Sequence, residues 1–343
     1  EELAEVARVH ATPRRTVLLE AATVPAAAAR AVAAPMEVSD DPCRVLLSST
    51  GLLARTTTDE PMAGDGNRAN HDVVTSVVRA TARGEIGAVT SAGRLVRVGV
   101  LDLPALPTTA AGPSLSGAAP VSEYVALDYG EQVIALTTLE AGSSGLALGT
   151  RGGTVKRVQP DHLTSRDAWE IIRLEPGDTV VGAVELATGR EELAFVTSDA
   201  QLLHFPASVV RPQGRGGSGI AGVRLSPGAS VVFFGAYDTD VPGMVVTVAG
   251  SADALPGTEA GTVKVTDLAA YPGKGRGTGG VRCHRFLRGE NVLRRAFVGH
   301  APVRAAAPSG VPVPLPEVDS RRDGSGTPAS GIIDGVGSGI SLG

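Results

Sequence analysis

Short stretches in which apolar and polar residues alternate recur along this chain. The clearest runs from Ala88 to Val98, where an apolar segment leads into a Ser-Ala-Gly turn and then into a segment that interleaves Arg94 and Arg97 with apolar residues. Alternation with period two is typical of a strand that buries one face. Gly93 supplies the positive φ that a tight turn needs. The stretch therefore predicts a β-hairpin.

Five further stretches repeat this pattern, which makes six copies. They are Leu46–Thr56, Ala147–Val158, Ala194–Phe205, Val245–Thr266 and Ala305–Leu315. The turn residues align at Gly51, Gly93, Gly153, Ala200, Gly261 and Gly310. Their mean spacing is about 52 residues, close to the roughly 40–50 residues of a propeller blade. The repeat predicts equivalent hairpin turns at these six positions.

A Gly-rich segment, here called a crossing, recurs between the hairpins. Arg211–Leu225 and Tyr271–Cys283 are the clearest examples, and further strands such as Val133–Leu139 and Val180–Leu186 follow crossings. Four short strands per unit, repeated six times, predict an all-β fold of six propeller-like blades over residues 35–335. Residues 1–34 are expected to form a short helix and a linker, and residues 336–343 a flexible tail.

Composition narrows the function classes. The net charge of −5, taken over the whole chain, argues against a nucleic-acid partner. Binding is decided by the local distribution of charge, however, so this value does not exclude one. Cys43 and Cys283 fit neither metal-ligand nor disulfide spacing. No apolar run reaches transmembrane length and no signal peptide is visible, so a cytoplasmic protein is expected. Because the chain begins without Met, we expect it to be a segment of a longer protein.

Nucleotide-binding motifs are not supported. Gly214–Gly219 and Gly275–Gly280 match G-x-G-x-x-G, but the residues after each match predict strands, whereas a dinucleotide site requires a helix there. No P-loop is present, and the histidines show no metal spacing. No catalytic residue, metal or cofactor is therefore expected in this chain.

Several segments resemble one family. E-E-L-A-E-V-A-R-V-H-A-T-P-R-R-T, at residues 1–16, resembles the end of the breakage-reunion region of the A subunit of bacterial type IIA topoisomerases, DNA gyrase and topoisomerase IV. D-D-P-C-R-V-L-L-S-S-T-G-L-L-A-R, at residues 40–55, resembles a first blade in the six-bladed β-pinwheel that forms the C-terminal DNA-wrapping domain of these proteins. Gln213–Gly219 (Q-G-R-G-G-S-G) resembles the gyrase A-subunit box.

This chain departs from the gyrase pattern in two respects. The gyrase box lies on the crossing after the first blade, where this chain has Met62–Asn70 with no Arg-Gly-Gly, and Ser218 stands where the box has Lys. The departures favour a topoisomerase IV-type or divergent A subunit. The resemblance implies a non-catalytic domain that binds and bends double-stranded DNA for strand passage in the cytoplasm, at the nucleoid. It also implies an A subunit that dimerises and pairs with an ATPase B subunit, with ATP and Mg²⁺ used elsewhere in the parent enzyme.

Basic residues four positions past the hairpin turns predict a stripe of cations on the rim of the disc, and the crossings add further cations close to backbone N–H groups. The alternative for each residue is an ordinary solvated strand position or a structural glycine segment. The alternative function is a propeller that serves as a protein-interaction platform. The residues expected to bind DNA are Arg55, Arg94, Arg97, Lys156, Arg157, His204, Gln213, Arg215, Lys264, Lys274 and Arg276.

Overall fold

The computed structural model describes residue 5 and residues 39–62, 67–107, 114–159, 163–255 and 257–338. The chain divides into two units, residues 1–38 and residues 39–343. The helix and linker predicted for residues 1–34 lie outside the described residues except for Glu5, which is helical and exposed. The second unit is built of strands.

Six antiparallel hairpins run through the described part of the second unit, and they are the six that the repeat predicts. All six predicted turn residues have positive φ, between 61° and 87°. Ala200 adopts this conformation at φ 61° where the other five copies have glycine. The hairpins, numbered first to sixth, are β1 (Pro42–Ser48) with β2 (Leu52–Thr56), β4 (Glu85–Thr90) with β5 (Arg94–Gly99), β9 (Leu146–Thr150) with β10 (Thr154–Val158), β13 (Glu192–Thr197) with β14 (Gln201–Pro206), β18 (Gly243–Gly250) with β19 (Thr262–Asp267), and β22 (Val303–Ala306) with β23 (Pro312–Val313).

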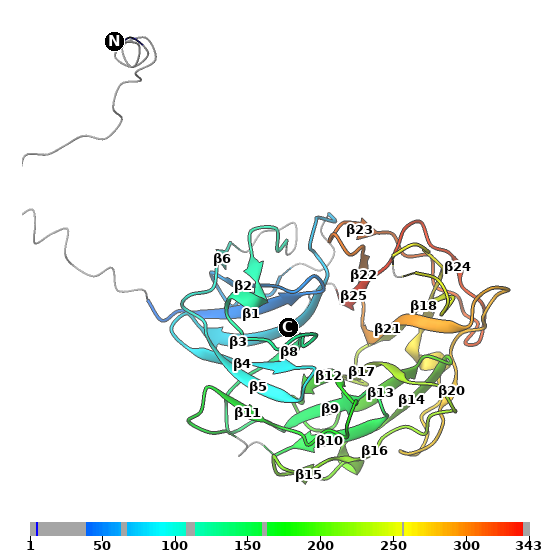
Figure 1. Ribbon diagram of the computed structural model, residues 1–343, viewed down its shortest axis with the longest axis horizontal. Coiled ribbons are helices and arrows are strands. Elements are labelled where there is room, and N and C mark those ends of the chain that lie inside the picture. The colour runs from blue at the N-terminus through cyan, green and yellow to red at the C-terminus, as the bar shows by residue number, and fades with distance from the viewer. Residues whose placement is uncertain are drawn as a thin grey trace, which may run out of the picture. The chain divides into compact units, whose positions relative to one another are not determined.

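Each hairpin pairs on its inner side with a later strand that faces the middle of the ring in Figure 1. These inner strands are β3 (Val74–Thr81), β8 (Val133–Thr137), β12 (Val180–Glu185), β17 (Val231–Tyr237), β21 (Val292–His300) and β25 (Gly335–Ser338). Because β25 pairs with both β22 and β3, the first and sixth hairpins share one eight-stranded sheet. The tail predicted from Val336 is therefore corrected: residues 336–338 are held in β25 by backbone pairing, and residues 339–343 lie outside the described residues.

The crossings interlock the sheets. Each crossing leaves its own hairpin and pairs with the outer strand of the preceding hairpin: the second with β2, the third with β5, the fourth with β10, the fifth with β14 and the sixth with β19. The strands of the crossings are β6 (Ala105–Leu106), β7 (Ala119–Pro120), β11 (Ala168–Glu170), β15 (Pro212–Gln213), β16 (Ile220–Ala221), β20 (Val281–Arg282) and β24 (Thr327–Pro328), with 3-10 turns η1 (Val121–Glu123), η3 (Ala207–Val209) and η4 (Leu268–Ala270).

The first crossing closes the ring by the same rule, because it contacts the sixth hairpin. The N–H of His71 donates to the carbonyl of Gly310 (2.8 Å), and the Arg68 guanidinium donates to the carbonyl of Ala305 (2.7 Å). The buried carboxylate of Asp72 accepts from Arg68 (2.6 Å) and from Arg304 of β22 (3.3 Å). The two ends of the unit are thus joined by backbone contacts and by a buried charge network.

Apolar layers fill the space between consecutive sheets. One layer, for example, joins Val155 of β10 with Phe195 and Phe205 of the fourth hairpin and Phe234 of β17. A second layer surrounds Trp169, which is buried between the second and third hairpins as core filling. Because each core lies between two sheets, neighbouring hairpins depend on one another for burial of their apolar faces.

Candidate nucleic-acid interface

Three of the predicted DNA-binding cations are buried. Lys156, His204 and Lys264 are 0%, 8% and 2% exposed. Each lies on the outer strand of a hairpin, but a crossing covers that strand, so the side chain faces the backbone of the crossing. The prediction that these residues contact phosphate is wrong for this reason.

The partners of the buried cations are protein groups. Lys156 Nζ donates to the carbonyls of Ile171, Arg215 and Gly217 at 2.7–2.8 Å. Lys264 Nζ donates to the carbonyls of Arg321 (3.2 Å) and Arg322. The His204 ring bonds Glu192 through Nδ1 and the Tyr271 carbonyl through Nε2 (2.9 Å). All three side chains therefore connect a hairpin to the crossing above it.

The remaining predicted strand cations are half-buried and engaged with the protein. Arg94 forms an ion pair with the buried carboxylate of Glu131, and Arg97 pairs with Glu85 (2.6 Å) and lies 5.7 Å from the ring centre of Trp169. The Arg157 guanidinium donates to the Ser144 carbonyl, at 2.6 Å from Nη2. Arg55 is also half-buried. These side chains do not form the uninterrupted rim stripe that the repeat predicts.

The cations of the fourth and fifth crossings are different, because Arg215, Lys274 and Arg276 are exposed. Gln213, which is half-buried, shapes the fourth crossing: its Oε1 accepts from the N–H of Gly219 (3.1 Å). Arg276 donates to the Ala221 carbonyl, and the N–H of Gly277 donates to the Gly222 carbonyl (2.7 Å), so the two crossings contact each other. The structure thus brings these predicted residues together.

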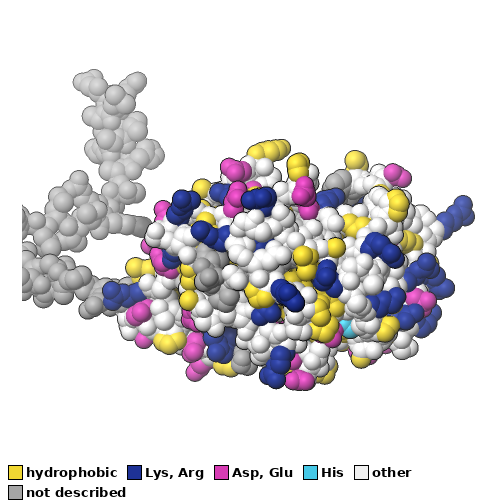
Figure 2. All heavy atoms as spheres, turned by 90° about the horizontal axis from the view of Figure 1, so that it is seen from below, with side chains coloured by type: hydrophobic (Ala, Val, Ile, Leu, Met, Phe, Trp, Pro, Cys, Tyr) yellow, Lys and Arg dark blue, Asp and Glu magenta, His cyan; other side chains and the backbone are white. Residues whose placement is uncertain are grey.

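Five more exposed arginines lie in these two crossings or directly after the fifth, and the repeat pattern did not predict them. They are Arg211, Arg224, Arg282, Arg285 and Arg288. The available signal was the local charge: residues 200–237 and 268–289 together contain eight lysines and arginines and no aspartate or glutamate. Figure 2, which views the unit from the lower edge of Figure 1, shows Lys and Arg gathered toward the right, the side on which β20 and β24 lie.

The opposite imbalance marks the second crossing and its surroundings. Residues 98–150 contain five acidic residues and no lysine or arginine. Tyr129 is fully exposed there and lies between Asp128 and Gly130. The sequence charge therefore favours a polyanion at the fourth and fifth crossings over residues 98–150.

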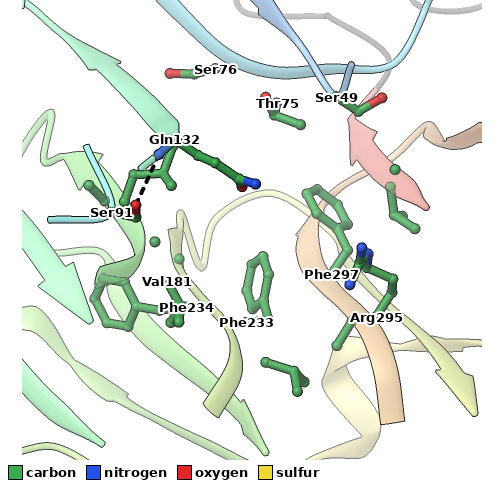
Figure 3. Close-up of a pocket in the computed structure, with 18 of the residues that line it drawn as sticks. Ser49, Thr75, Ser76, Ser91, Gln132, Val181, Phe233, Phe234, Arg295 and Phe297 are labelled. Carbon is green, nitrogen blue, oxygen red and sulfur yellow. Dashed lines mark hydrogen bonds between the residues drawn. The ribbon is translucent and has the colours of Figure 1, made fainter. Parts of the chain in front are cut away.

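The inner strands surround a central channel of about 1350 Å³. Figure 3 shows Ser49, Thr75, Ser76, Ser91 and Gln132 around it, with Phe233 and Phe297 projecting into the space from β17 and β21. The guanidinium of Arg295 pairs with Asp334. No group of three or more His, Cys, Asp or Glu residues that could hold a metal occurs in the described ranges. The channel lining therefore combines hydroxyl and aromatic groups with charged side chains such as Arg295 and Asp334.

His284 links the fifth and sixth crossings and gives the fold an acid-sensitive contact. Its Nδ1 bonds the Thr247 hydroxyl (2.9 Å), and its Nε2 accepts from the N–H of Gly326 (3.2 Å). Burial, reinforced by the charge of Lys264, lowers the pKa of His284 to about 4. Protonation would remove the acceptor that Gly326 uses.

We expect the free energy of unfolding to fall as the pH drops from about 6.5 to 4. In that window the unfolded state binds a proton at His284 that the folded state excludes, and the full shift corresponds to about 3 kcal/mol. Guanidinium unfolding at pH 7 and pH 4 measures the loss. His284→Gln should lose less stability than the native chain over the same window, and equal losses would contradict this role.

Comparison with known proteins agrees with this architecture. A family model described as the DNA gyrase C-terminal domain, beta-propeller, matches residues 191–236 and 257–285, the region of the fourth and fifth hairpins and crossings. The DNA gyrase A subunit of Staphylococcus aureus (strain NCTC 8325 / PS 47) is 27% identical over 266 residues, which cover 75% of this chain and 28% of that protein. The same protein from strain MRSA252 gives the same values.

Solved structures support the fold. The C-terminal domain of DNA topoisomerase IV matches with a TM-score of 0.66 at 18% identity, over 87% of this chain and 93% of the other. The DNA gyrase A C-terminal domain matches with a TM-score of 0.59 at 15% identity, over 88% and 100%. This chain is similar to the C-terminal domains of the A subunits of DNA gyrase and DNA topoisomerase IV.

The predicted resemblance to these A-subunit domains and the all-β pinwheel class are thereby confirmed. The chain spans 28% of the length of the curated gyrase proteins that it matches. In fold it scores higher against the topoisomerase IV domain, whereas the sequence relatives named above are gyrase proteins. No helix in the described part of the chain is both long and apolar enough to cross a membrane.

Proposed function

We propose that this A-subunit domain binds and bends duplex DNA on the surface formed by the fourth and fifth crossings, here called the basic surface. It consists of the eight exposed cations Arg211, Arg215, Arg224, Lys274, Arg276, Arg282, Arg285 and Arg288. The observation that carries the proposal is their concentration, without a single acidic residue, in a chain whose net charge is −5. Phosphate contacts of this kind hold DNA without reading its sequence.

The path of the DNA differs from the one that the rim stripe suggested. A duplex held by this surface crosses the fourth and fifth hairpins and avoids residues 98–150, which contain five acidic residues and no lysine or arginine. Bending a stiff duplex over a short site costs on the order of 1–6 kcal/mol. Eight cations in two contiguous crossings provide the many weak contacts that offset this cost.

In the parent protein the domain would hold a DNA segment for strand passage by a dimeric A subunit. An ATPase B subunit would pair through regions outside this chain and would use ATP and Mg²⁺. The similarity to gyrase A subunits supports this proposal, and the residues that the family model matches, 191–236 and 257–285, contain seven of the eight cations of the basic surface. Such a protein works in the cytoplasm, at the nucleoid.

Fluorescence anisotropy with a labelled duplex over a salt series tests the proposal. We expect binding at low salt that weakens steeply, with a log–log slope of roughly −5 if about six phosphates are neutralised. Absence of binding at low salt, or a slope near zero, would overturn it. The protein-platform alternative would then gain support, with the acidic stretch 98–150 as its first candidate surface.

A further inference from the structure

This chain has only three lysines among its 31 basic residues, and the other 28 are arginines. All three lysines donate to backbone carbonyls of a crossing. Lys156 donates to carbonyls of the fourth crossing, and Lys264 donates to carbonyls of the sixth crossing. Lys274 is itself part of the fifth crossing and donates to the carbonyl of Gly280 in the same crossing (2.9 Å). In a chain that uses arginine for every other cation, lysine occurs only where an ammonium meets carbonyl oxygens of a crossing.

Lys156 lies under a loop that begins and ends on its own strand. On the N-terminal side of Lys156, β16 pairs with β10 at Val155 and Ile220, and on the C-terminal side β15 pairs at Arg157 and Pro212. Residues 214–219 therefore rise from the edge of β10 and return to it. The ammonium lies inside this loop, 2.7 Å from the Arg215 carbonyl and 2.8 Å from the Gly217 carbonyl.

Lys264 occupies the equivalent place on β19. The sixth crossing pairs with β19 at Val263 and Thr327 and bridges it at Val265 and Val318, so Lys264 again stands between the two attachment points. Its ammonium donates to the carbonyls of Arg321 and Arg322. The same device thus appears twice in the fold, two hairpins apart.

The chemistry of these sites favours lysine. An ammonium is a compact charge with three donors, which suits the three carbonyls around Lys156, whereas a planar guanidinium donates in a fixed fork. The first hairpin shows that the position does not require a cation in general, because the residue there is buried Ala54. At the equivalent position under the fifth crossing the residue is buried Leu203, so lysine is present only under the fourth and sixth crossings.

We propose that Lys156 is a positioning residue of the DNA interface, which holds loop 214–219 in the shape that presents Arg215 to phosphate. Arg215 is the residue whose carbonyl Lys156 binds, and its side chain is exposed. Lys264 orders the sixth crossing in the same way, but the guanidinium of Arg321 there is paired with Asp319 (2.9 Å). The effect of Lys156 on DNA affinity rests on the proposed DNA-binding function. Its role in holding the shape of loop 214–219 rests on the loop geometry alone.

Acylation of amines in the native chain tests the mechanism without DNA. With acetic acid N-hydroxysuccinimide ester and peptide mass spectrometry, we expect exposed Lys274 to react at least tenfold faster than Lys156 and Lys264. Lys156 reacting as fast as Lys274 would overturn the proposal, because an ammonium enclosed by three carbonyls is shielded from the reagent.

Duplex affinity of variants tests the consequence. We expect Lys156→Met and Lys156→Arg each to weaken duplex binding about tenfold, even though Lys156→Arg keeps the charge. In the Lys156→Met background, the further substitution Arg215→Ala should weaken binding less than twofold more. Lys264→Met is the matched control and should change affinity less than twofold. If Lys156→Arg binds duplex with native affinity, the positioning role of Lys156 is contradicted. It is also contradicted if the losses of affinity from Lys156→Met and Arg215→Ala are fully additive.

Hydrogen exchange separates the two proposals. In Lys156→Met the amides of residues 214–219 should exchange at least tenfold faster while the strands of other hairpins keep their protection, and Lys156→Gln takes its place if the Met variant does not fold. If the native chain binds no duplex, the proposed function fails, and unchanged exchange in the loop overturns the positioning role independently.

Discussion

Reversing the charges of Arg215 and Arg276 together should weaken duplex binding about 100-fold at low salt, a loss of about 2.7 kcal/mol. The two side chains are exposed on adjacent crossings, and the backbones of those crossings contact each other through Gly222 and Gly277. Each substitution to Glu removes an attraction and adds a repulsion against the same phosphates. Anisotropy titrations should also give a salt slope about two units shallower than that of the native chain.

The matched control is Arg83→Glu with Arg190→Glu, which changes net charge by the same amount. Both arginines lie outside the fourth and fifth crossings. We expect this pair to weaken binding less than threefold. If both double variants lose affinity equally, binding follows net charge and the basic surface has no special role.

Asp72→Ala should lower the free energy of unfolding by about 3–5 kcal/mol. Its buried carboxylate accepts from Arg68 and Arg304, and Arg304 is itself only 3% exposed. Removing the carboxylate leaves the positive charge of Arg304 buried without its acidic partner. The substitution also removes the charge network that joins the first crossing to the sixth hairpin. Guanidinium unfolding measures the loss, and hydrogen exchange should quicken in β22 and β23.

Asp334→Ala provides the comparison, because Asp334 pairs with Arg295 at the surface, where the two side chains are 43% and 49% exposed. An exposed pair contributes about 0–1 kcal/mol. If Asp72→Ala and Asp334→Ala lower the free energy of unfolding by similar amounts, the Asp72 network does not stabilise the contact between the first crossing and the sixth hairpin.

The hairpins could be predicted because their signal is local. The apolar strand and the turn residue with positive φ both lie within one short stretch of chain, and even the exceptional copy at Ala200 keeps the left-handed turn at φ 61°. The expectation that these strands bury only one face was wrong, because strands such as β4, β9 and β18 are buried at consecutive residues between neighbouring sheets and crossings. The sequence also indicated the crossings, through their glycines. What it did not indicate is that each crossing pairs with the preceding hairpin, because that pairing joins segments that are far apart along the chain.

This missing pairing explains the errors at the site. Lys156, His204 and Lys264 were expected on a solvent-facing edge, but the crossings occupy that edge and turn the cations inward. Arg215, Lys274 and Arg276 were predicted on exposed crossings and are exposed. The five further arginines could have been found by comparing the charge of each crossing instead of the charge of the whole chain.

Hydrogen exchange of the native chain with and without a saturating duplex tests the central proposal most directly. The proposal predicts that DNA slows exchange in residues 211–224 and 274–288 and leaves residues 98–150 unchanged. Slower exchange confined to residues 98–150 or to the first hairpin, with none in the fourth and fifth crossings, would contradict it.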